Sequence, residues 1–243
     1  MLKSRLCIAF FAFAVGCAPA QKPLTDYVNP MLGTATLWDS VDLGFKPTKR
    51  TWGAEVFPGS SLPNAMVQVS PVTKFHSGAG YQYEDSVIYG FTHTNKGHWN
   101  LCHIPLLPVT GTPTPGDYCS PFSHERESAA PGYYQVFLDR YGVDAQLSST
   151  LRCAFHKYTY PAGAAASLLA DLQRSNEHVR AWDIRKEGDN VFAGWQQTGE
   201  KMYFYAVANR PVTGIEPVVE GDREVRIVRF GEGDGALELR IGF

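Results

Sequence analysis

The sequence predicts an all-β protein built as an antiparallel β-sandwich. Three observations carry this prediction. Short stretches alternate apolar and polar residues, turn signals containing Gly and Pro separate them at short and regular intervals, and no amphipathic helix exceeds about three turns. Strands at this spacing, with no helices between them, indicate a sandwich and not a parallel sheet of βαβ units.

The first strand candidates lie between residues 66 and 139. The stretch "MVQVSPV" at 66–72 alternates apolar and polar residues, as a half-buried strand does. Three more stretches are bounded by Gly, Pro or a turn signal, namely "VIYGFTHT" at 87–94, "IPLLPVTG" at 104–111 and "YYQVFLD" at 133–139. We expect all four to be strands.

The clearest alternation occupies "VDAQLSSTLRCAF" at 143–155. Its apolar positions share one parity and its polar positions the other, which predicts one buried and one wet face; the apolar set is Val143, Ala145, Leu147, Leu151, Cys153 and Phe155. Five stretches continue the pattern: "ASLLADL", "VRAWDIR", "NVFAGWQQ", "KMYFYAVA" and "REVRIVRF".

The last residues, 237–243, form a further strand candidate. Leu237, Leu239, Ile241 and Phe243 alternate with Glu238, Arg240 and Gly242. The chain stops on an apolar strand position without a polar tail. A natural terminus can do this, and so does a chain cut partway through a longer protein.

Composition bounds the class of function. The chain has 243 residues, of which 44% are hydrophobic and 19% charged, as in a foldable globular protein of one large or two small domains. The net charge is −2, with no long run of either sign. A nucleic-acid partner needs a basic face that displaces counterions from phosphates, so we expect no nucleic-acid binding.

Residues 1–20 are typical of a secretory signal peptide. Lys3 and Arg5 precede an apolar run that is too short to span a bilayer as a permanent helix. Two processing sites compete: "APA" at 18–20 is an A-x-A cleavage site, and "AVGC" at 14–17 is close to a bacterial lipobox. Either site predicts a secreted or periplasmic protein, and acylation of Cys17 would attach it to the membrane as an outer-membrane lipoprotein.

Three cysteines remain beyond the signal: Cys102, Cys119 and Cys153. At most one internal disulfide can form among them, and we interpret them as buried free thiols.

Residues 31–64 are rich in Gly, Pro, Ser and Thr and lack a sustained period, which predicts long loops. Loops of that length within a compact domain usually carry function.

The stretch "FTHTNKGHWN" at 91–100 concentrates polar and aromatic groups, and "LCH" follows it. A zinc site was one interpretation, because His93, His98, Cys102 and His103 lie within eleven residues. Their spacing matches no standard zinc pattern, however. Sugar binding fits the stretch better, since sugars stack on aromatic faces and take hydrogen bonds from groups such as His and Asn. The structural alternative is that Trp99 fills the core and the histidines cap strand ends.

Catalytic patterns are weak elsewhere in the sequence. There is no G-x-S-x-G elbow, no P-loop and no G-x-G-x-x-G after a strand. A glycosidase needs two carboxylates across the sugar ring, and no Asp or Glu here is singled out by its neighbours. The residues therefore predict no catalytic and no metal-ligating set.

Six motifs in order over residues 27–161 carry a family likeness: "YVNPMLGT", "VFPGSSLPNAMVQVSP", "GYQYEDSVIYGFTHT", "LLPVTG", "SHERESAAPGYYQVFL" and "HKYTYP". Together they resemble the N-terminal domain of glycoside hydrolase family 92, exo-acting α-mannosidases, here expected to be of α-1,2 type. The likeness continues more loosely to Phe243.

The resemblance implies a galactose-mutarotase-like β-sandwich over residues 21–243 that packs on a C-terminal (α/α)6 barrel. It also implies that the catalytic acid, the catalytic base and most ligands of a calcium ion belong to that barrel, which is absent from this sequence. No catalytic residue and no cofactor can therefore be carried over to this chain. The sandwich would supply rim loops to a pocket for mannose-containing glycans, and the loop from Trp38 to Trp52 is longer than usual.

Three hypotheses follow. In the first, the chain is the sandwich of a family 92 α-mannosidase, truncated before the barrel, inactive alone and inclined to aggregate through an uncovered apolar face. In the second, it is a free-standing, monomeric carbohydrate-binding exported lipoprotein. The third and weakest is a zinc-dependent exported enzyme.

The candidate substrate-binding residues are Trp99, His98, Asn95 and His93. The family pattern "SHTH" continues with a Ser/Gly-rich run, whereas this chain reads "THTNKGHWNLCH", which leaves the linkage preference open. We expect a strand at 91–94 that runs into a pocket-rim loop, with His98 and Trp99 contacting sugar and His93 and Asn95 supporting them.

Overall fold

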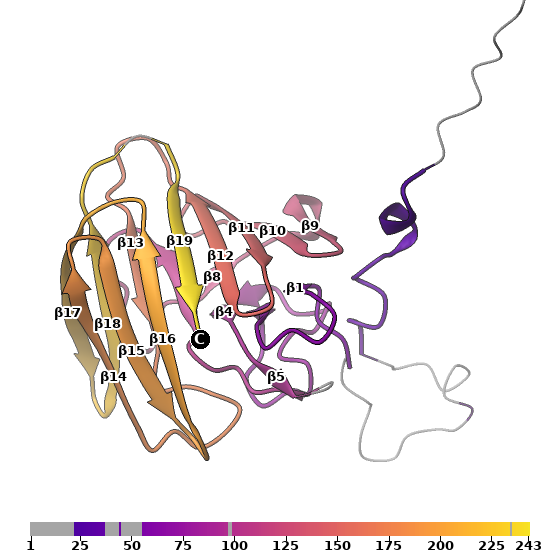
Figure 1. Cartoon of the computed structure of the whole chain (residues 1–243), viewed down its shortest axis with the longest axis horizontal. Helices are drawn as coiled ribbons and strands as arrows, with labels where there is room; N and C mark the ends of the chain where they lie inside the picture. Colours follow the sequence, from indigo (N-terminus) through magenta and orange to yellow (C-terminus); the bar gives the residue numbers. More distant parts are fainter. Residues whose placement is uncertain (1–21, 37–43, 45–54, 97–98, 234) are drawn as a thin grey trace, which may run out of the picture.

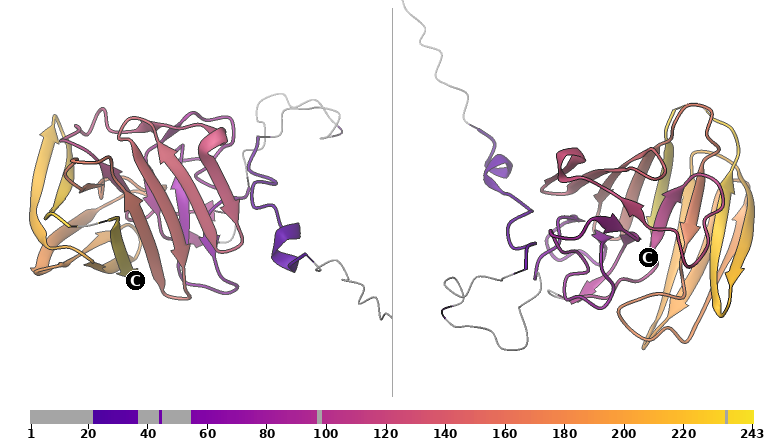
Figure 2. Two further views of the ribbon diagram at one scale, coloured as in Figure 1. Left: turned by 90° about the horizontal axis from the view of Figure 1, so that it is seen from above. Right: turned by 180° about the vertical axis from the view of Figure 1, so that it is seen from behind.

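The computed structural model describes residues 22–36, 44, 55–96, 99–233 and 235–243. These residues form two large antiparallel sheets stacked face to face (Figures 1 and 2), and their only helices are the short 3-10 segments η1 (Leu24–Tyr27) and η2 (His124–Arg126). The all-β sandwich predicted from the sequence is confirmed. Within this part of the chain, no helix has the length and apolarity needed to cross a bilayer.

The first sheet has seven strands in the order β1-β2-β4-β7-β13-β18-β17. Their bounds are β1 (Ser60–Ser61), β2 (Gln68–Val72), β4 (Gly90–Thr92), β7 (Leu106–Val109), β13 (Ser167–Ala170), β18 (Arg223–Phe230) and β17 (Val212–Glu220). The residues of β4, β7 and β13 are buried on both faces, so these strands read as apolar runs and not as alternations.

The second sheet has eight strands in the order β14-β15-β16-β19-β12-β11-β10-β9. Their bounds are β14 (Ala181–Gly188), β15 (Val191–Gln197), β16 (Lys201–Ala208), β19 (Leu237–Gly242), β12 (Cys153–Thr159), β11 (Val143–Ser149), β10 (Tyr133–Leu138) and β9 (Glu127–Ala130). Burial alternates along β10, β11 and β19 as predicted, because one face of this sheet meets the core and the other meets solvent.

Two small pairs complete the fold: β3 (Val87–Ile88) with β8 (Ser120–Pro121), and β5 (Asn95–Lys96) with β6 (Trp99–Asn100). The second pair is a hairpin that follows β4 directly. The predicted strand at 91–94 is therefore shorter than expected, since β4 ends at Thr92 and pairing resumes only at Asn95.

The stretch 143–155 is not one strand, which corrects the prediction. β11 ends at Ser149, the chain turns, and β12 begins at Cys153. The turn is closed by Thr150, whose N–H donates to Cys153 O at 2.8 Å and whose Oγ1 accepts from Cys153 N at 3.1 Å. The turn changes the parity, so Leu151 and Cys153 are exposed while Ala154, His156 and Tyr158 face the core.

The cysteine interpretation holds only in part. All three described thiols are free, but only Cys102 is buried, Cys119 is partly buried and Cys153 is exposed. The predictions about residues 1–20 including Cys17, about His98 and about the loop from Trp38 to Trp52 lie outside the described residues, apart from Gly44.

Candidate functional site

The β5–β6 hairpin carries the most exposed of the described candidate residues. Asn95 pairs with Asn100 and Lys96 with Trp99, which is 38% exposed, whereas Asn100 is fully buried. Large aromatic side chains are usually drawn into the core. An indole left at the surface by a short hairpin is therefore available for stacking.

His93 lies beneath this hairpin, between the two sheets. It has no exposed surface, its ring stacks on that of His156 in β12, and Phe243 packs on it with ring centroids 4.8 Å apart. In this arrangement the His93 side chain contacts the core and does not reach the surface.

The two histidines form an ordered chain of hydrogen bonds. His93 Nδ1 lies 3.0 Å from Ile104 O, and because a carbonyl only accepts, Nδ1 carries the hydrogen. His93 Nε2 then accepts from His156 Nε2–H at 3.2 Å, and His156 Nδ1 accepts from the Tyr158 hydroxyl at 2.6 Å. Both rings are neutral in this pattern. Burial lowers the pKa of His93 to about 3, and burial together with His93 lowers the pKa of His156 well below its usual value.

Asn95 has an unusual environment. The oxygen and nitrogen of its side-chain amide are both buried, and neither has a hydrogen-bond partner in the described part of the chain. Leaving a buried amide unpaired is costly, so native proteins usually pair it with protein, water or ligand. The amide of Asn95 is thus a group able to accept and donate hydrogen bonds at the base of the Trp99 hairpin.

The segment after the hairpin adopts a backbone that L-residues rarely take. Cys102 and Ile104 have φ angles of 52° and 54°, and for a β-branched residue such as Ile this is an outlier that surrounding contacts must maintain. Gly80 (φ 76°) lies against this segment, where an added Cβ would come within 2.6 Å of Asn100 Nδ2 and 3.1 Å of Cys102 Sγ.

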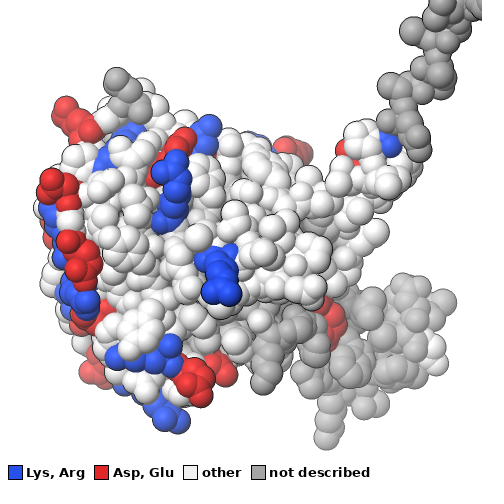
Figure 3. Space-filling model, in the orientation of Figure 1, with Lys and Arg blue, Asp and Glu red and all other residues white. Residues whose placement is uncertain are grey.

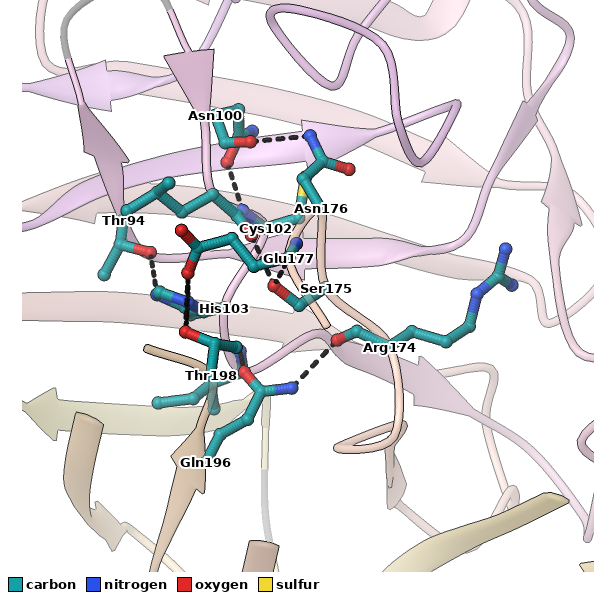
Figure 4. Close-up of polar contacts among 12 residues, drawn as sticks. Thr94, Asn100, Cys102, His103, Arg174, Ser175, Asn176, Glu177, Gln196 and Thr198 are labelled. Atoms are coloured by element: carbon teal, nitrogen blue, oxygen red, sulfur yellow. Dashed lines mark hydrogen bonds and ion pairs between the residues drawn. The ribbon is translucent and has the colours of Figure 1, made fainter. Parts of the chain in front are cut away.

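A second loop, residues 173–177, holds this segment in place (Figure 4). Asn176 Nδ2 donates to Asn100 O at 2.6 Å and to Ser77 O at 3.1 Å, and its Oδ1 accepts from His76 N at 2.6 Å. Ser175 Oγ donates to Leu101 O at 2.7 Å.

Gln196, at the end of β15, closes the network from the other sheet. Its Oε1 accepts from Ile104 N at 2.8 Å, and its Nε2 donates to Leu172 O and Arg174 O, both at 2.9 Å (Figure 4). The left-handed backbone at Cys102 and Ile104 is therefore stabilised by side chains from two distant segments, the loop 173–177 and the end of β15.

His103 joins the buried network to a carboxylate at the surface. Its Nε2 lies 3.3 Å from Glu177 Oε2, which also accepts from Thr198 Oγ1 at 2.5 Å, and its Nδ1 lies 2.9 Å from Thr94 Oγ1. A carboxylate only accepts, so the hydrogen of His103 is on Nε2. Burial lowers the pKa of His103, and Glu177 opposes that shift.

Glu177 and Trp99 are therefore presented on adjoining loops. The Glu177 side chain is 42% exposed. Trp99 precedes Asn100 and Glu177 follows Asn176, and a hydrogen bond joins Asn176 to Asn100. An aromatic face can stack on the C–H face of a sugar, and a carboxylate can accept hydrogen bonds from the hydroxyls of a sugar. The hydrogen bonds of Glu177 place no second carboxylate beside it among the described residues, whereas glycoside hydrolysis uses a pair.

The donor set does not fit a metal ion. In the described ranges, no three His, Cys, Asp or Glu side chains are grouped so as to hold one. Calcium takes six to eight oxygen ligands at about 2.3–2.6 Å, and these residues do not offer that set. Of the proposed zinc ligands, His93 uses both ring nitrogens inside the core, and His98 lies outside the described residues.

The structure thus brings Asn95 and Trp99 together on one hairpin and separates His93 from them by burial. Sequence reasoning named Asn100 as one of the polar groups of this stretch but missed Asn176, Glu177, Gln196 and Thr198. One signal was present, the polar run "QRSNEH" at 173–178 after an apolar strand, but nothing in the sequence connects it to a hairpin about 75 residues earlier.

The fold has counterparts among known proteins. The model of the glycosyl hydrolase family 92 N-terminal domain matches residues 27–242, which is most of the chain, so the chain belongs to that family. No curated protein matches the sequence significantly.

Solved structures agree in fold. The family GH92 alpha-mannosidase BT3965 from Bacteroides thetaiotaomicron matches with a TM-score of 0.76 and 24% identity, over 91% of this chain and 33% of that chain. The same protein in complex with mannoimidazole matches with a TM-score of 0.74 and 24% identity, over 91% and 32%. The GH92 inverting mannosidase BT2199 from the same organism gives 0.72 and 22%, over 92% and 32%. This chain spans about a third of the length of these structures.

Proposed function

We propose that this chain is the carbohydrate-binding N-terminal domain of an exported family 92 α-mannosidase. Its Trp99 hairpin shapes the rim of the mannose pocket, and the catalytic acid and base are supplied by a separate C-terminal barrel. On its own the chain binds mannose-containing glycans weakly and does not hydrolyse them, because it lacks the groups that stabilise the transition state.

One observation carries the proposal: the exposed indole of Trp99 and the partly exposed carboxylate of Glu177 are on two loops that the Asn100–Asn176 hydrogen bond joins. Preorganised loops bind with less loss of conformational entropy than mobile ones. The mannoimidazole complex of a structurally similar mannosidase supports mannose as the sugar class.

A second observation supports a partner domain. The outer face of β15 and β16 has a hollow of about 510 Å³ whose walls include Trp195, Tyr203, Tyr205 and Phe243. Tyr203 is 60% and Tyr205 53% exposed. Single soluble domains seldom leave such an aromatic face uncovered, which favours a domain of a larger protein over a free-standing lipoprotein.

The test is calorimetric titration of the purified chain with α-1,2-mannobiose. Trp99→Ala should weaken binding at least fivefold through the lost stacking, or about 1 kcal/mol. Tyr205→Ala, which removes another exposed aromatic ring, is the matched control and should bind like the parent. Equal affinity of Trp99→Ala and the parent would contradict the proposed site. Robust mannosidase turnover by the chain alone would contradict the proposal that a separate domain supplies the catalytic acid and base.

A further inference from the structure

A second hollow, away from the Trp99 hairpin, is lined by arginines. It lies at the edge of the sandwich where the start of β14 meets the start of β18, and its volume is about 620 Å³. Four arginine residues contribute to its lining, namely Arg174, Arg180, Arg223 and Arg226. Charged side chains gather along this edge of the molecule, over β14, β17 and β18, whereas the face over β10 to β12 is largely uncharged (Figure 3).

The carboxylates nearby do not balance these four charges. Arg223 pairs with the buried Asp171 at 2.7 Å, and Arg226 with Glu224 at 2.7 Å. The other lining carboxylate, Asp183, contacts Arg185 at 3.3 Å instead.

In the described part of the chain, Arg180 has no carboxylate partner, whereas Arg174 interacts electrostatically with the buried Asp171. The Arg174 guanidinium lies over the rings of Phe75 and Tyr89, at 4.1 and 4.8 Å, and donates to the Tyr118 hydroxyl at 3.3 Å. The Arg180 side chain is at the exposed mouth of the hollow. The hollow therefore has an excess of positive charge inside a concave wall, which concentrates the field there.

Arg226 combines an unpaired donor with an aromatic neighbour. The Nε–H of Arg226 is buried and has no hydrogen-bond partner among the described residues. Its guanidinium lies over the ring of Trp182, 5.3 Å from the centroid, and Trp182 also lines the hollow. The N–H donors of a guanidinium lie in one plane and match two oxygens of a carboxylate or phosphate, a geometry that single water molecules do not offer.

We propose that this hollow binds an oxyanion, a carboxylate or a phosphate group, between Arg180 and Arg226. Trp182 offers an apolar face on which a sugar ring bearing that group can rest. The site is separate from the Trp99 hairpin and goes beyond the function proposed above.

The test is calorimetric titration of the chain with mannose 6-phosphate, glucuronate, inorganic phosphate and neutral mannose, at low and high salt. Mannose 6-phosphate and glucuronate should bind more tightly at low salt, and mannose should not bind in the hollow. Tighter binding of mannose 6-phosphate than of inorganic phosphate would identify a sugar-borne group as the ligand, and equal binding would identify the free anion.

Arg180→Gln removes one guanidinium group from an exposed position, so the variant should fold normally. It should lower oxyanion affinity at least tenfold. Arg152→Gln is the matched control, because it removes the same charge from an exposed position between β11 and β12 that does not line the hollow, and it should leave the affinity unchanged. Trp99→Ala should also retain oxyanion binding, which separates this proposal from the first. Equal losses in Arg180→Gln and Arg152→Gln, or no binding at millimolar ligand, would overturn it.

Discussion

The polar loops beneath Trp99 differ from the aromatic face over β15 and β16. The polar side chains of the loops have hydrogen-bond partners within the chain, whereas the aromatic rings of the face are exposed to solvent. Beneath Trp99, the side chains of Asn100, Asn176 and Gln196 each bond two or three partners, and the loops keep a left-handed backbone. On the aromatic face, Tyr203 and Tyr205 are more than half exposed. Apart from the amide of Asn95, the described side chains of the first region have their hydrogen-bond partners within the chain, whereas the second region is suited to being covered by another domain.

Removing Asn176 should produce the largest effect, because the first region depends on it. Asn176→Ala deletes bonds to His76 N, Ser77 O and Asn100 O and leaves buried groups unpaired. We expect the free energy of unfolding to fall by about 2–4 kcal/mol. Urea denaturation measures it.

The control for this change is Asn209→Ala, which removes two comparable side-chain bonds at an exposed position. This substitution should lower the free energy of unfolding by less than about 1 kcal/mol, because water replaces the lost hydrogen-bond partners. Equal losses in the two variants would show that the network beneath Trp99 contributes no special stability.

The second-largest effect should come from acid, which should lower the free energy of unfolding through the histidines of the same region. The folded chain keeps His93 and His156 neutral because their pKa values are depressed, whereas in the unfolded chain they take up protons near pH 6.5. Stability is therefore full above about pH 6.5 and is lost as pH falls toward about 3, by up to about 1.4 kcal/mol per pH unit for each histidine.

Urea denaturation between pH 7 and pH 5 measures this slope. His156→Gln removes one titrating group and should flatten the dependence of the unfolding free energy on pH, whatever its effect at pH 7. An unchanged slope in that variant would contradict the assignment of the pH dependence to the histidine pair.

The smallest effect on stability is expected on the aromatic face. The double variant Tyr203→Ser with Tyr205→Ser removes rings that contact solvent, so the unfolding free energy should change by less than about 1 kcal/mol. Self-association, measured by sedimentation velocity, should decrease, because less apolar surface is exposed. Val219→Ser, at an exposed position on β17, is the control and should self-associate like the parent. Greater association of the double variant would contradict the comparison.

Much of the fold could be predicted from the sequence, because alternation of apolar and polar residues follows directly from the geometry of a half-buried strand. β11 and β19 were predicted in this way. The prediction failed at 150–152, where a turn shifted the parity within an apparently continuous pattern. It also missed β17, whose Gly214 and Pro217 interrupt the apolar pattern although the strand pairs with β18 along its length.

Only the hairpin residues of the candidate site could be recognised in the sequence. Trp99 and Asn95 are conspicuous because aromatic and amide groups seldom gather in one short polar stretch. The side chains that hold them follow no local period, because residues such as Asn176, Gln196 and Thr198 lie 70 to 100 positions further along the chain.

By itself, the sequence determined the fold class, the family resemblance and the position of a polar stretch that carries Trp99, since these depend on local patterns and on motifs in order. Only the tertiary structure decided that His93 is a core residue paired with His156, that Glu177 lies beside the Trp99 hairpin, and that four arginines share one hollow. These facts depend on long-range strand pairing, which places distant residues in contact through the packing of two sheets and leaves no periodic trace in the sequence.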